Sequence, residues 1–356
     1  MLEIISNEQR KYFGLEEINP NWQEVKVESE NFNGFDVVIY IDENIVRKCI
    51  IYGPSKYKEM QMNTELTKNL DAIVVDESNK KTSSLDSIIN KAGSGVTILF
   101  DASNITIYNE NTKIVYYKNF HEDKSNLKTI ENFKNWVEKW CEESTEADIA
   151  DVKSFASETQ VKHIDFNEGD VFKIKLSRRL YGYGRILLSY AKMRNNKEDF
   201  WDCLIGTPVI ASLYHILTED SNLSVDQLKG LMSFPSEIII DSNFYHGEYE
   251  IIGNIPVDYD SEDYPIMYGR TVTDKQTHYQ NGKTHLVIND KPLYNNFKYN
   301  GVAHNLGFDL SVMKKCIDES SNDSYYMSGP FIAKGDLRNP VNVEKLNLIL
   351  KQFALD

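Results

Sequence analysis

Short segments rich in β-branched and aromatic residues, joined by short polar turns, constrain the fold of this 356-residue chain more than any other feature. Residues 35–42 and 45–52 meet at Asp42-Glu43-Asn44, which predicts a β-hairpin. After a polar loop, the pattern returns in three further segments: residues 96–101, 104–108 and 113–117. Because strands do not alternate regularly with helices, the pattern predicts antiparallel rather than parallel sheets.

Amphipathic helices accompany these strands. A helix predicted over residues 127–141 places five large apolar residues on one face: Ile130, Phe133, Trp136, Val137 and Trp140. Further helices are predicted near residues 224–230, 310–318 and 341–353. Sheets covered by helices predict an α+β protein of two domains, each a mainly antiparallel β-sheet with packed helices.

The stretch 142–160 is acidic, rich in Ser and Ala and without strong apolar periodicity, which indicates a domain boundary. We expect an N-terminal α+β domain over residues 1–145, a partly helical acidic linker over 146–164, and a C-terminal α+β domain over 165–356. Residues 169–191 predict two strands around Gly182-Tyr183-Gly184. These tyrosine-flanked glycines favour a strand bulge or a hairpin over a phosphate-binding loop.

The net charge of the chain indicates which kinds of partner it can bind. The formal net charge is −15, from 54 acidic and 39 basic residues. Such a field repels the phosphate backbone of nucleic acids and speeds association with a basic partner. The alternative is that the acidity only keeps the protein soluble.

Sequence features also bear on location. No segment has the roughly 18 consecutive apolar residues of a membrane helix, and the N-terminus lacks the pattern of a secretory signal. The cysteines occur singly, without CxxC or metal-ligand spacing: Cys49, Cys141, Cys203 and Cys316. Isolated cysteines fit buried thiols in a reducing compartment. These features predict a cytoplasmic protein that binds no membrane.

Motifs of catalysis are absent from the sequence: it has no HExxH, GxSxG, Walker loop or GxGxxG. No two of its histidines have i,i+2 or i,i+4 spacing, although folding can bring distant histidines together. Cys203 and Cys316 lie among apolar residues, which raise a thiol pKa and favour inert packing. We therefore predict no catalytic residue, no metal site and no cofactor.

Residues 258–263 form a dense acidic run with tyrosines on either side of its last residues. Oxygen ligands of this kind are used by calcium sites, but the run lacks the glycine and terminal glutamate of an EF-hand. An exposed loop is the favoured interpretation.

Tyrosine, arginine and acidic residues concentrate in three segments of the second half. Tyr and Arg are favoured anchors in protein interfaces because they bury a large area and satisfy a polar tip. Each tyrosine can equally be a half-buried cross-strand partner on a sheet. The predicted partner-binding residues are Arg178, Arg179, Tyr181, Tyr183, Arg185, Tyr245, Glu248, Tyr249, Glu250, Asp258, Tyr259, Asp260, Glu262 and Asp263.

The segment GDVFKIKLSRRLYGYGRILLSYAK resembles the opening of the immunity protein 26 family, found beside secreted toxins in bacterial conflict systems. The resemblance continues through FWDCLIGTPVIASLYHIL, FPSEIIIDSNFYHGEYEIIGNIPV and DYPIMYGR, and covers roughly residues 165–320. Residues 1–145, with NEQRKYFGL, Trp22 and IVRKCIIY, look like a module of other bacterial immunity proteins.

The resemblance implies a non-enzymatic inhibitor that binds and neutralises a protein toxin of a polymorphic toxin system. The acidic charge adds that the toxin is basic, with a nuclease as one candidate. No catalytic residue carries over, because the family is not defined by one. Some members are labelled phosphotriesterase-like, so a metal-dependent hydrolase using His278 or His285 is the alternative. An intracellular scaffold would share the same binding physics.

Overall fold

The computed structural model describes residues 4–27, 34–66, 93–190, 207–270, 275–294, 306, 310–328 and 334–355. The chain divides into two compact units, Met1–Lys162 and His163–Asp356. Antiparallel sheets and packed helices occur in both units, which confirms the predicted α+β class. Within the described ranges, no helix is both long and apolar enough to cross a membrane.

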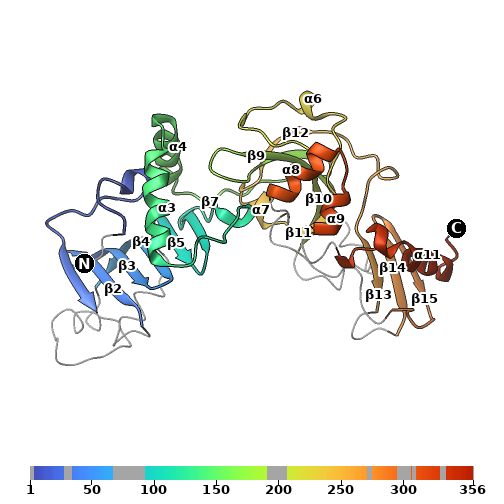
Figure 1. The fold of residues 1–356 in the computed structure, drawn as a ribbon, viewed down its shortest axis with the longest axis horizontal. Helices are drawn as coiled ribbons and strands as arrows, with labels where there is room; N and C mark the ends of the chain where they lie inside the picture. Colours follow the sequence, from blue (N-terminus) through green and yellow to red (C-terminus); the bar gives the residue numbers. More distant parts are fainter. Residues whose placement is uncertain are drawn as a thin grey trace. The chain divides into compact units, whose positions relative to one another are not determined.

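The first unit contains one seven-stranded antiparallel sheet whose strands follow the order of the sequence (Figure 1). Its strands are β1 (Gln23–Val27), β2 (Asp36–Asp42), β3 (Ile45–Gly53), β4 (Lys56–Glu65), β5 (Val96–Asp101), β6 (Asn104–Asn109) and β7 (Val115–Lys118). The predicted hairpins are present at β2–β3 and β5–β6. Glu43, in the two-residue loop of the first hairpin, has a φ of 54°, in the left-handed region that such hairpin turns favour.

Strand β4 lies where the sequence predicted a polar loop, and that prediction is wrong. Tyr57 and Glu59 point to one face and Met60 and Met62 belong to the apolar cluster of the other. Glu59 is fully buried yet charged, because two cations reach it from other parts of the unit. Because the charged Glu59 is buried in an ion pair, β4 lacks the alternation of apolar and polar residues that predicts a strand.

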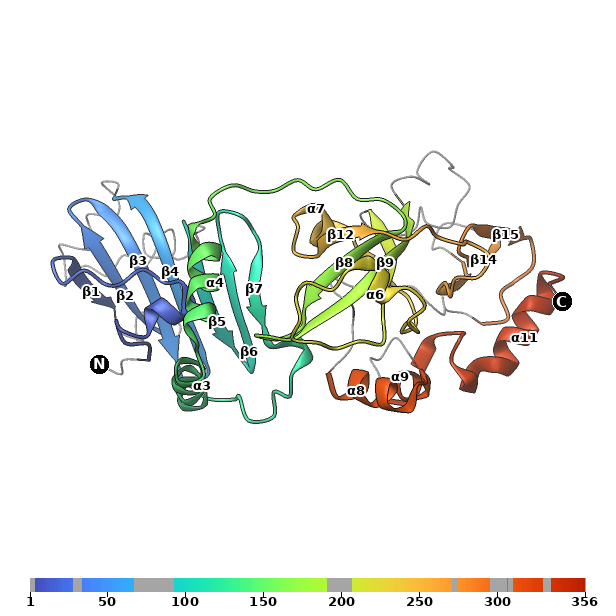
Figure 2. The same cartoon turned by 90° about the horizontal axis from the view of Figure 1, so that it is seen from above.

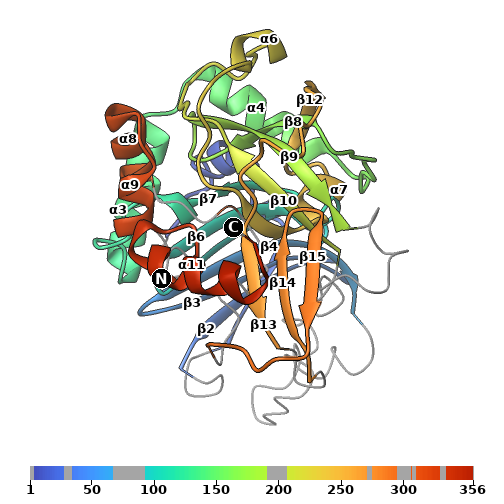
Figure 3. The same ribbon diagram turned by 90° about the vertical axis from the view of Figure 1, so that its right-hand side faces the viewer.

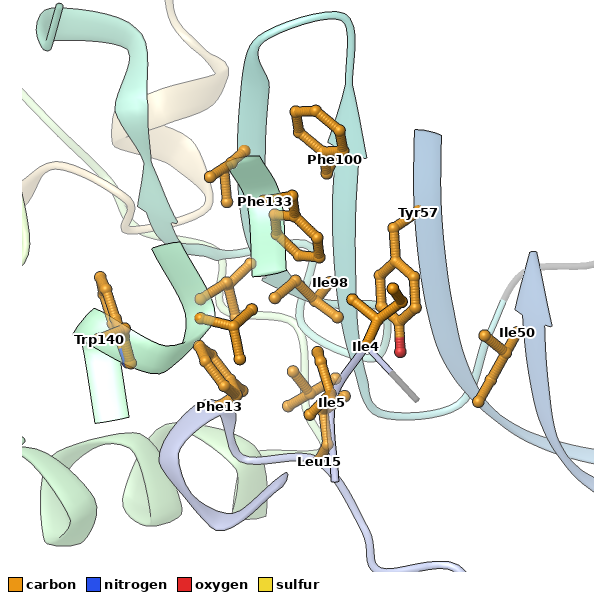
Figure 4. Packing of buried hydrophobic residues seen from close by; sticks show 14 of the residues in the cluster. Ile4, Ile5, Phe13, Leu15, Ile50, Tyr57, Ile98, Phe100, Phe133 and Trp140 are labelled. Carbon is orange, nitrogen blue, oxygen red and sulfur yellow. The ribbon is translucent and has the colours of Figure 1, made fainter. Parts of the chain in front are cut away.

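Helices α3 (Ile130–Glu142) and α4 (Glu146–Ser157), with the 3₁₀ helix η1 (Arg10–Phe13), contribute to the core on one face of this sheet. Phe133 of α3 is fully buried and stacks on Phe100 of β5, with ring centres 4.9 Å apart (Figure 4). Thr129 caps α3 by accepting the backbone N–H of Asn132 at 3.2 Å. A further 3₁₀ helix, η3 (Asn119–His121), follows β7.

Helix α4 occupies much of the segment predicted as an acidic linker. Thr145 caps it, and Val152 is 1% exposed within the core of the first unit. The division between the two units falls after Lys162. Phe155 and Ala156, both partly buried, pack against the same core, so α4 docks through an apolar stripe near its C-terminal end.

The second unit contains a five-stranded antiparallel sheet in the order β11-β10-β9-β8-β12, of which β8, β9 and β12 are labelled in Figure 2. Its strands are β8 (Asp170–Lys175), β9 (Tyr181–Ser189), β10 (Pro208–Leu213), β11 (Glu237–Ile240) and β12 (Glu250–Asn254). Helices α8 (Leu310–Glu319) and α9 (Asp323–Ser328) supply Met313, Cys316 and Tyr325 to its larger core. Two short helices, α6 (Val225–Leu228) and α7 (Ser242–Tyr245), lie in the connections.

Strands β8 and β9 form the predicted pair, but Gly182 and Gly184 lie inside β9 rather than at the turn. The turn is at residues 177–180, closed by the Leu176 N–H donating to the Leu180 carbonyl at 2.8 Å. At Gly184 an added Cβ would meet the Ser212 carbonyl of β10 and lie 2.5 Å from a ring carbon of Phe172. This glycine allows two strands to approach closely.

A three-stranded antiparallel sheet that the sequence analysis did not predict completes the second unit (Figure 3). It consists of β13 (Ile266–Gly269), β14 (Thr277–Asn281) and β15 (Thr284–Ile288), and helix α11 (Val343–Gln352) packs on it after η5 (Pro340–Asn342). The available signal was the Asn281-Gly282 dipeptide, a strong hairpin indicator; Gly282 has a φ of 56°.

Candidate protein-binding surface

One face of the five-stranded sheet carries two polar side chains next to two tyrosines. Arg185 of β9 lies opposite Ser212 of β10 in the antiparallel register, so both side chains leave the same face. Tyr183 and Tyr214 follow on this face and are buried in a small apolar cluster. The opposite face of these strands carries the larger core of the unit.

The fold divides the predicted arginine and tyrosine group. Arg178 and Arg179 lie in the turn before β9, the first half-buried and the second exposed, and Tyr181 is half-buried. Tyr183 is fully buried, and its hydroxyl donates to the Asp220 carbonyl at 2.8 Å. The prediction that Tyr183 lies on a binding surface is wrong, because alternation along β9 turns it into the core.

The group around Tyr245 is divided in the same way. Tyr245 is 41% exposed at the end of α7, and Glu248 is half-buried. Glu250 is exposed and accepts from the Lys173 ammonium at 2.9 Å. Tyr249 is only 2% exposed and belongs to the larger core, so its predicted surface role is also wrong.

The acidic run forms an irregular segment between β12 and β13, here called the acidic loop, residues 257–264. Asp258 and Asp260 are exposed, and neither forms an ion pair within the described part of the chain. Backbone hydrogen bonding tightens the loop, since the Ser261 N–H donates to the Asp258 carbonyl at 3.1 Å. The loop therefore presents two unneutralised carboxylates to solvent.

Tyr259 fixes the first half of the acidic loop. Its hydroxyl donates to the Glu168 carboxylate, and the Lys283 ammonium lies 3.0 Å from the centre of its ring. The hydrogen bond to Glu168, assisted by burial, raises the pKa of Tyr259 to about 12. The hydroxyl is therefore a protonated donor at neutral pH.

Glu262 ties the second half of the acidic loop to the sheet. It forms an ion pair with Arg185 of β9, and both side chains are largely buried, at 16% and 15% exposure. Arg185 also donates to the Pro256 carbonyl at 3.4 Å. A charge-assisted bond of this type restrains the loop backbone. Arg185 and Glu262, both predicted as partner-binding residues and 77 positions apart in the sequence, are therefore in contact.

Arg338, which the sequence analysis missed, holds the last residue of the run. Its guanidinium donates to Asp336 at 2.6 Å, to the Asp263 carboxylate at 2.8 Å and to the Ser236 carbonyl at 2.8 Å. Burial alone would lower the pKa of Arg338, but Asp336 and Asp263 outweigh it and raise that pKa. The local sequence Asp336-Leu337-Arg338 does not predict that one arginine binds three separate groups.

A polar cavity of about 310 Å³ lies beside these anchors. Its lining comes from the acidic loop, from β10, from the segment before β11, from α9 and from Arg338. The polar residues among these are Ser212, Ser233, Ser236, Glu262, Asp263, Asn322, Tyr326 and Arg338. Side chains from segments far apart in sequence therefore line one cavity, and no local sequence motif predicts it.

The histidines of the alternative hydrolase interpretation lie on the three-stranded sheet. His278 Nδ1 and His285 Nε2 are 3.1 Å apart, and their rings are stacked. Among the described residues, no three His, Cys, Asp or Glu side chains gather closely enough to hold a metal ion. His304 and Cys203 lie outside the described residues. Cys316 is fully buried, and burial raises the pKa of its thiol.

Comparison with known proteins identifies one family. Residues 167–278 match the family described as immunity protein 26, in agreement with the resemblance seen in the sequence. Neither the curated proteins nor the solved structures contain a match to the chain. The matched segment includes β8 to β13 and the whole acidic loop. The family match supports a toxin-immunity role, and that role is one of non-catalytic inhibition.

Proposed function

We propose, from the match of residues 167–278 to the immunity protein 26 family, that this chain binds a basic bacterial toxin in the cytoplasm and neutralises it. The match carries the proposal, because an immunity protein acts by binding a protein toxin. The basic character of the toxin, its activity as a nuclease and the place of inhibition are the parts that we add.

The charge of the chain supports a basic partner. A net charge of −15 attracts a cationic protein over about a Debye length, roughly 8 Å at physiological salt, and raises its association rate. The same field disfavours nucleic acid. A basic nuclease suits both conditions, since its own positive surface is what binds DNA or RNA.

The acidic loop is the proposed centre of the interface. Asp258 and Asp260 are exposed and form no ion pair with any residue in the described ranges, while Tyr259 and Glu262 hold the loop backbone in place. A loop restrained before binding loses less conformational entropy on association. Its exposed carboxylates can then pair with lysine or arginine residues of the toxin, since neither is engaged in an ion pair with a described residue.

The test is co-expression with the toxin encoded beside this chain. We expect the wild-type chain to rescue cells arrested by the toxin and to co-purify with it. Asp258→Asn with Asp260→Asn should weaken the complex about tenfold or more at low salt, mainly through slower association. Asp226→Asn on α6 is the matched control, because Asp226 is 85% exposed and its partner is Lys229, which lies three residues away. Failure of the wild type to protect against any adjacent toxin would refute the proposed function.

A further inference from the structure

The Arg338 guanidinium has no N–H left to offer an anion in the cavity beside it. Every part of the guanidinium is already engaged: Nε and Nη2 donate to Asp336, and Nη1 donates to Asp263 and to the Ser236 hydroxyl. The cation that lines this cavity is therefore fully used by the protein itself.

Acceptors in the cavity are not used in the same way. Glu262 binds Arg185 through Oε1, and no described residue donates to its Oε2. Ser212 is 4% exposed, lines the cavity, and its hydroxyl has no hydrogen-bond partner anywhere in the described ranges. The half-buried Tyr326 also lines the cavity, and no described residue hydrogen-bonds to its hydroxyl. Both hydroxyls line the cavity and can therefore accept a hydrogen bond from a ligand that enters it.

The formal charges around the cavity favour a cation. Three carboxylates (Glu262, Asp263 and Asp336) face two guanidinium groups (Arg185 and Arg338), which leaves one negative charge in excess. Asp336 is fully buried and Arg338 is 8% exposed, so this charge is weakly screened.

We propose that the cavity receives one lysine or arginine side chain of the toxin. This inference rests on the proposed function. It names a contact that would slow dissociation of the complex after electrostatic attraction has brought the two proteins together. A volume of about 310 Å³ corresponds to about ten waters at roughly 30 Å³ each, more atoms than either side chain contains. The incoming cation pairs with Glu262 and Asp263 and donates to the Ser212 and Tyr326 hydroxyls. Seating in such a pocket slows dissociation.

The cavity can be tested without the toxin by ligand-observed NMR of the full chain. We expect n-butylammonium and methylguanidinium, at millimolar concentration, to give saturation transfer from the protein, and neutral n-butanol to give much less. Asp263→Asn removes a charge, and Ser233→Leu fills the cavity without changing charge; each should abolish the signal. Equal signals from n-butanol, or unchanged signals in both variants, would overturn the inference.

The toxin complex provides the second test. Asp263→Asn and Ser233→Leu should each raise its Kd about tenfold or more through faster dissociation, whereas Asp226→Asn should leave it unchanged. Circular dichroism and melting temperature establish that the variants fold. If the wild type neutralises the toxin and both variants do so equally well, the cavity inference fails and the proposed function stands. If the wild type takes up the cations but binds no toxin, the proposed function fails and only the cation preference survives.

Discussion

Glu59 is a fully buried, charged residue in the first unit and forms ion pairs with two cations. It accepts from Lys48 at 2.7 Å, from Arg10 at 2.9 Å and from the Tyr57 hydroxyl at 2.6 Å. Burial alone would raise the pKa of Glu59, but Lys48 and Arg10 outweigh burial and lower it to about 2. The carboxylate is thus bound in its charged form, at a large desolvation cost that its partners offset.

Glu59→Gln should destabilise the protein at neutral pH by about 3 to 5 kcal/mol, because it leaves two buried cations without their anion. The folded pKa of about 2 lies below the ordinary glutamate pKa of 4.5. The contribution of Glu59 is therefore complete above about pH 4.5 and is lost as pH falls toward 2. Urea unfolding at pH 7 and pH 3 measures this, and the difference between wild type and variant should shrink at the lower pH.

Tyr57→Phe is the control for that experiment. It removes one hydrogen bond to Glu59 but keeps the three charges. We expect a loss of about 1 to 3 kcal/mol with the acid-dependent part largely retained. A Glu59→Gln protein as stable as wild type at pH 7 would show that the buried ion cluster contributes nothing.

At the scale of elements, β9 shows how one glycine sets the spacing of a sheet. The Gly182-Tyr183-Gly184 segment predicted a bulge or a hairpin, but it pairs regularly with β8. The register shift between β9 and β10 lies further along, where Ile210 pairs with Leu188 and Ala211 with Ile186, so Leu187 of β9 is the extra residue. Gly184 faces the larger core, where backbone and ring atoms leave no room for a Cβ. The two glycines indicated that some position in β9 requires the absence of a side chain, but the sequence did not show that this position is Gly184.

Gly184→Ala should therefore destabilise the second unit by more than about 2 kcal/mol, because the new methyl group forces β9 away from β10 and Phe172. Gly182→Ala is the matched control on the same strand, since its Cβ would meet only the flexible Leu176 side chain, at 2.9 Å. We expect the control to change stability by less than about 1 kcal/mol. Denaturant unfolding of both variants decides the point, and equal losses would contradict the packing argument.

At the scale of the whole molecule, the two units have separate sheets and separate cores. We expect Met1–Lys162 and His163–Asp356 to fold when expressed apart, with cooperative thermal transitions followed by circular dichroism. Glu59→Gln should lower the melting temperature of the first fragment, and Gly184→Ala that of the second. A fragment without a cooperative transition would show that its core depends on the other unit.

Net charge also acts at this scale. With −15 formal charges, association with a basic toxin should slow by about tenfold or more between 50 mM and 500 mM salt, while dissociation changes little. Stopped-flow or surface-plasmon measurements of the purified complex give both rates. An association rate independent of salt would remove the electrostatic argument for a basic partner.

The sequence alone determined what depends on near neighbours along the chain. The β2–β3 hairpin, the apolar face of α3 and the short helix near residues 224–230 follow from periodicity and turn chemistry, and the structure contains each of them. The antiparallel α+β class follows from the same signals. The resemblance over the second half also rested on contiguous segments, and the family match covers residues 167–278.

Only the tertiary structure decided what depends on residues far apart in sequence. Glu59 is buried because Arg10 and Lys48 reach it, and the charged pattern of β4 therefore read as a loop. Tyr183 and Tyr249 share their residue type with exposed Tyr245, yet the pairing of strands places them in cores. The cavity beside Arg338 likewise needs several separate segments at once. Burial and charge compensation are properties of the assembled fold, and no window of sequence contains both partners.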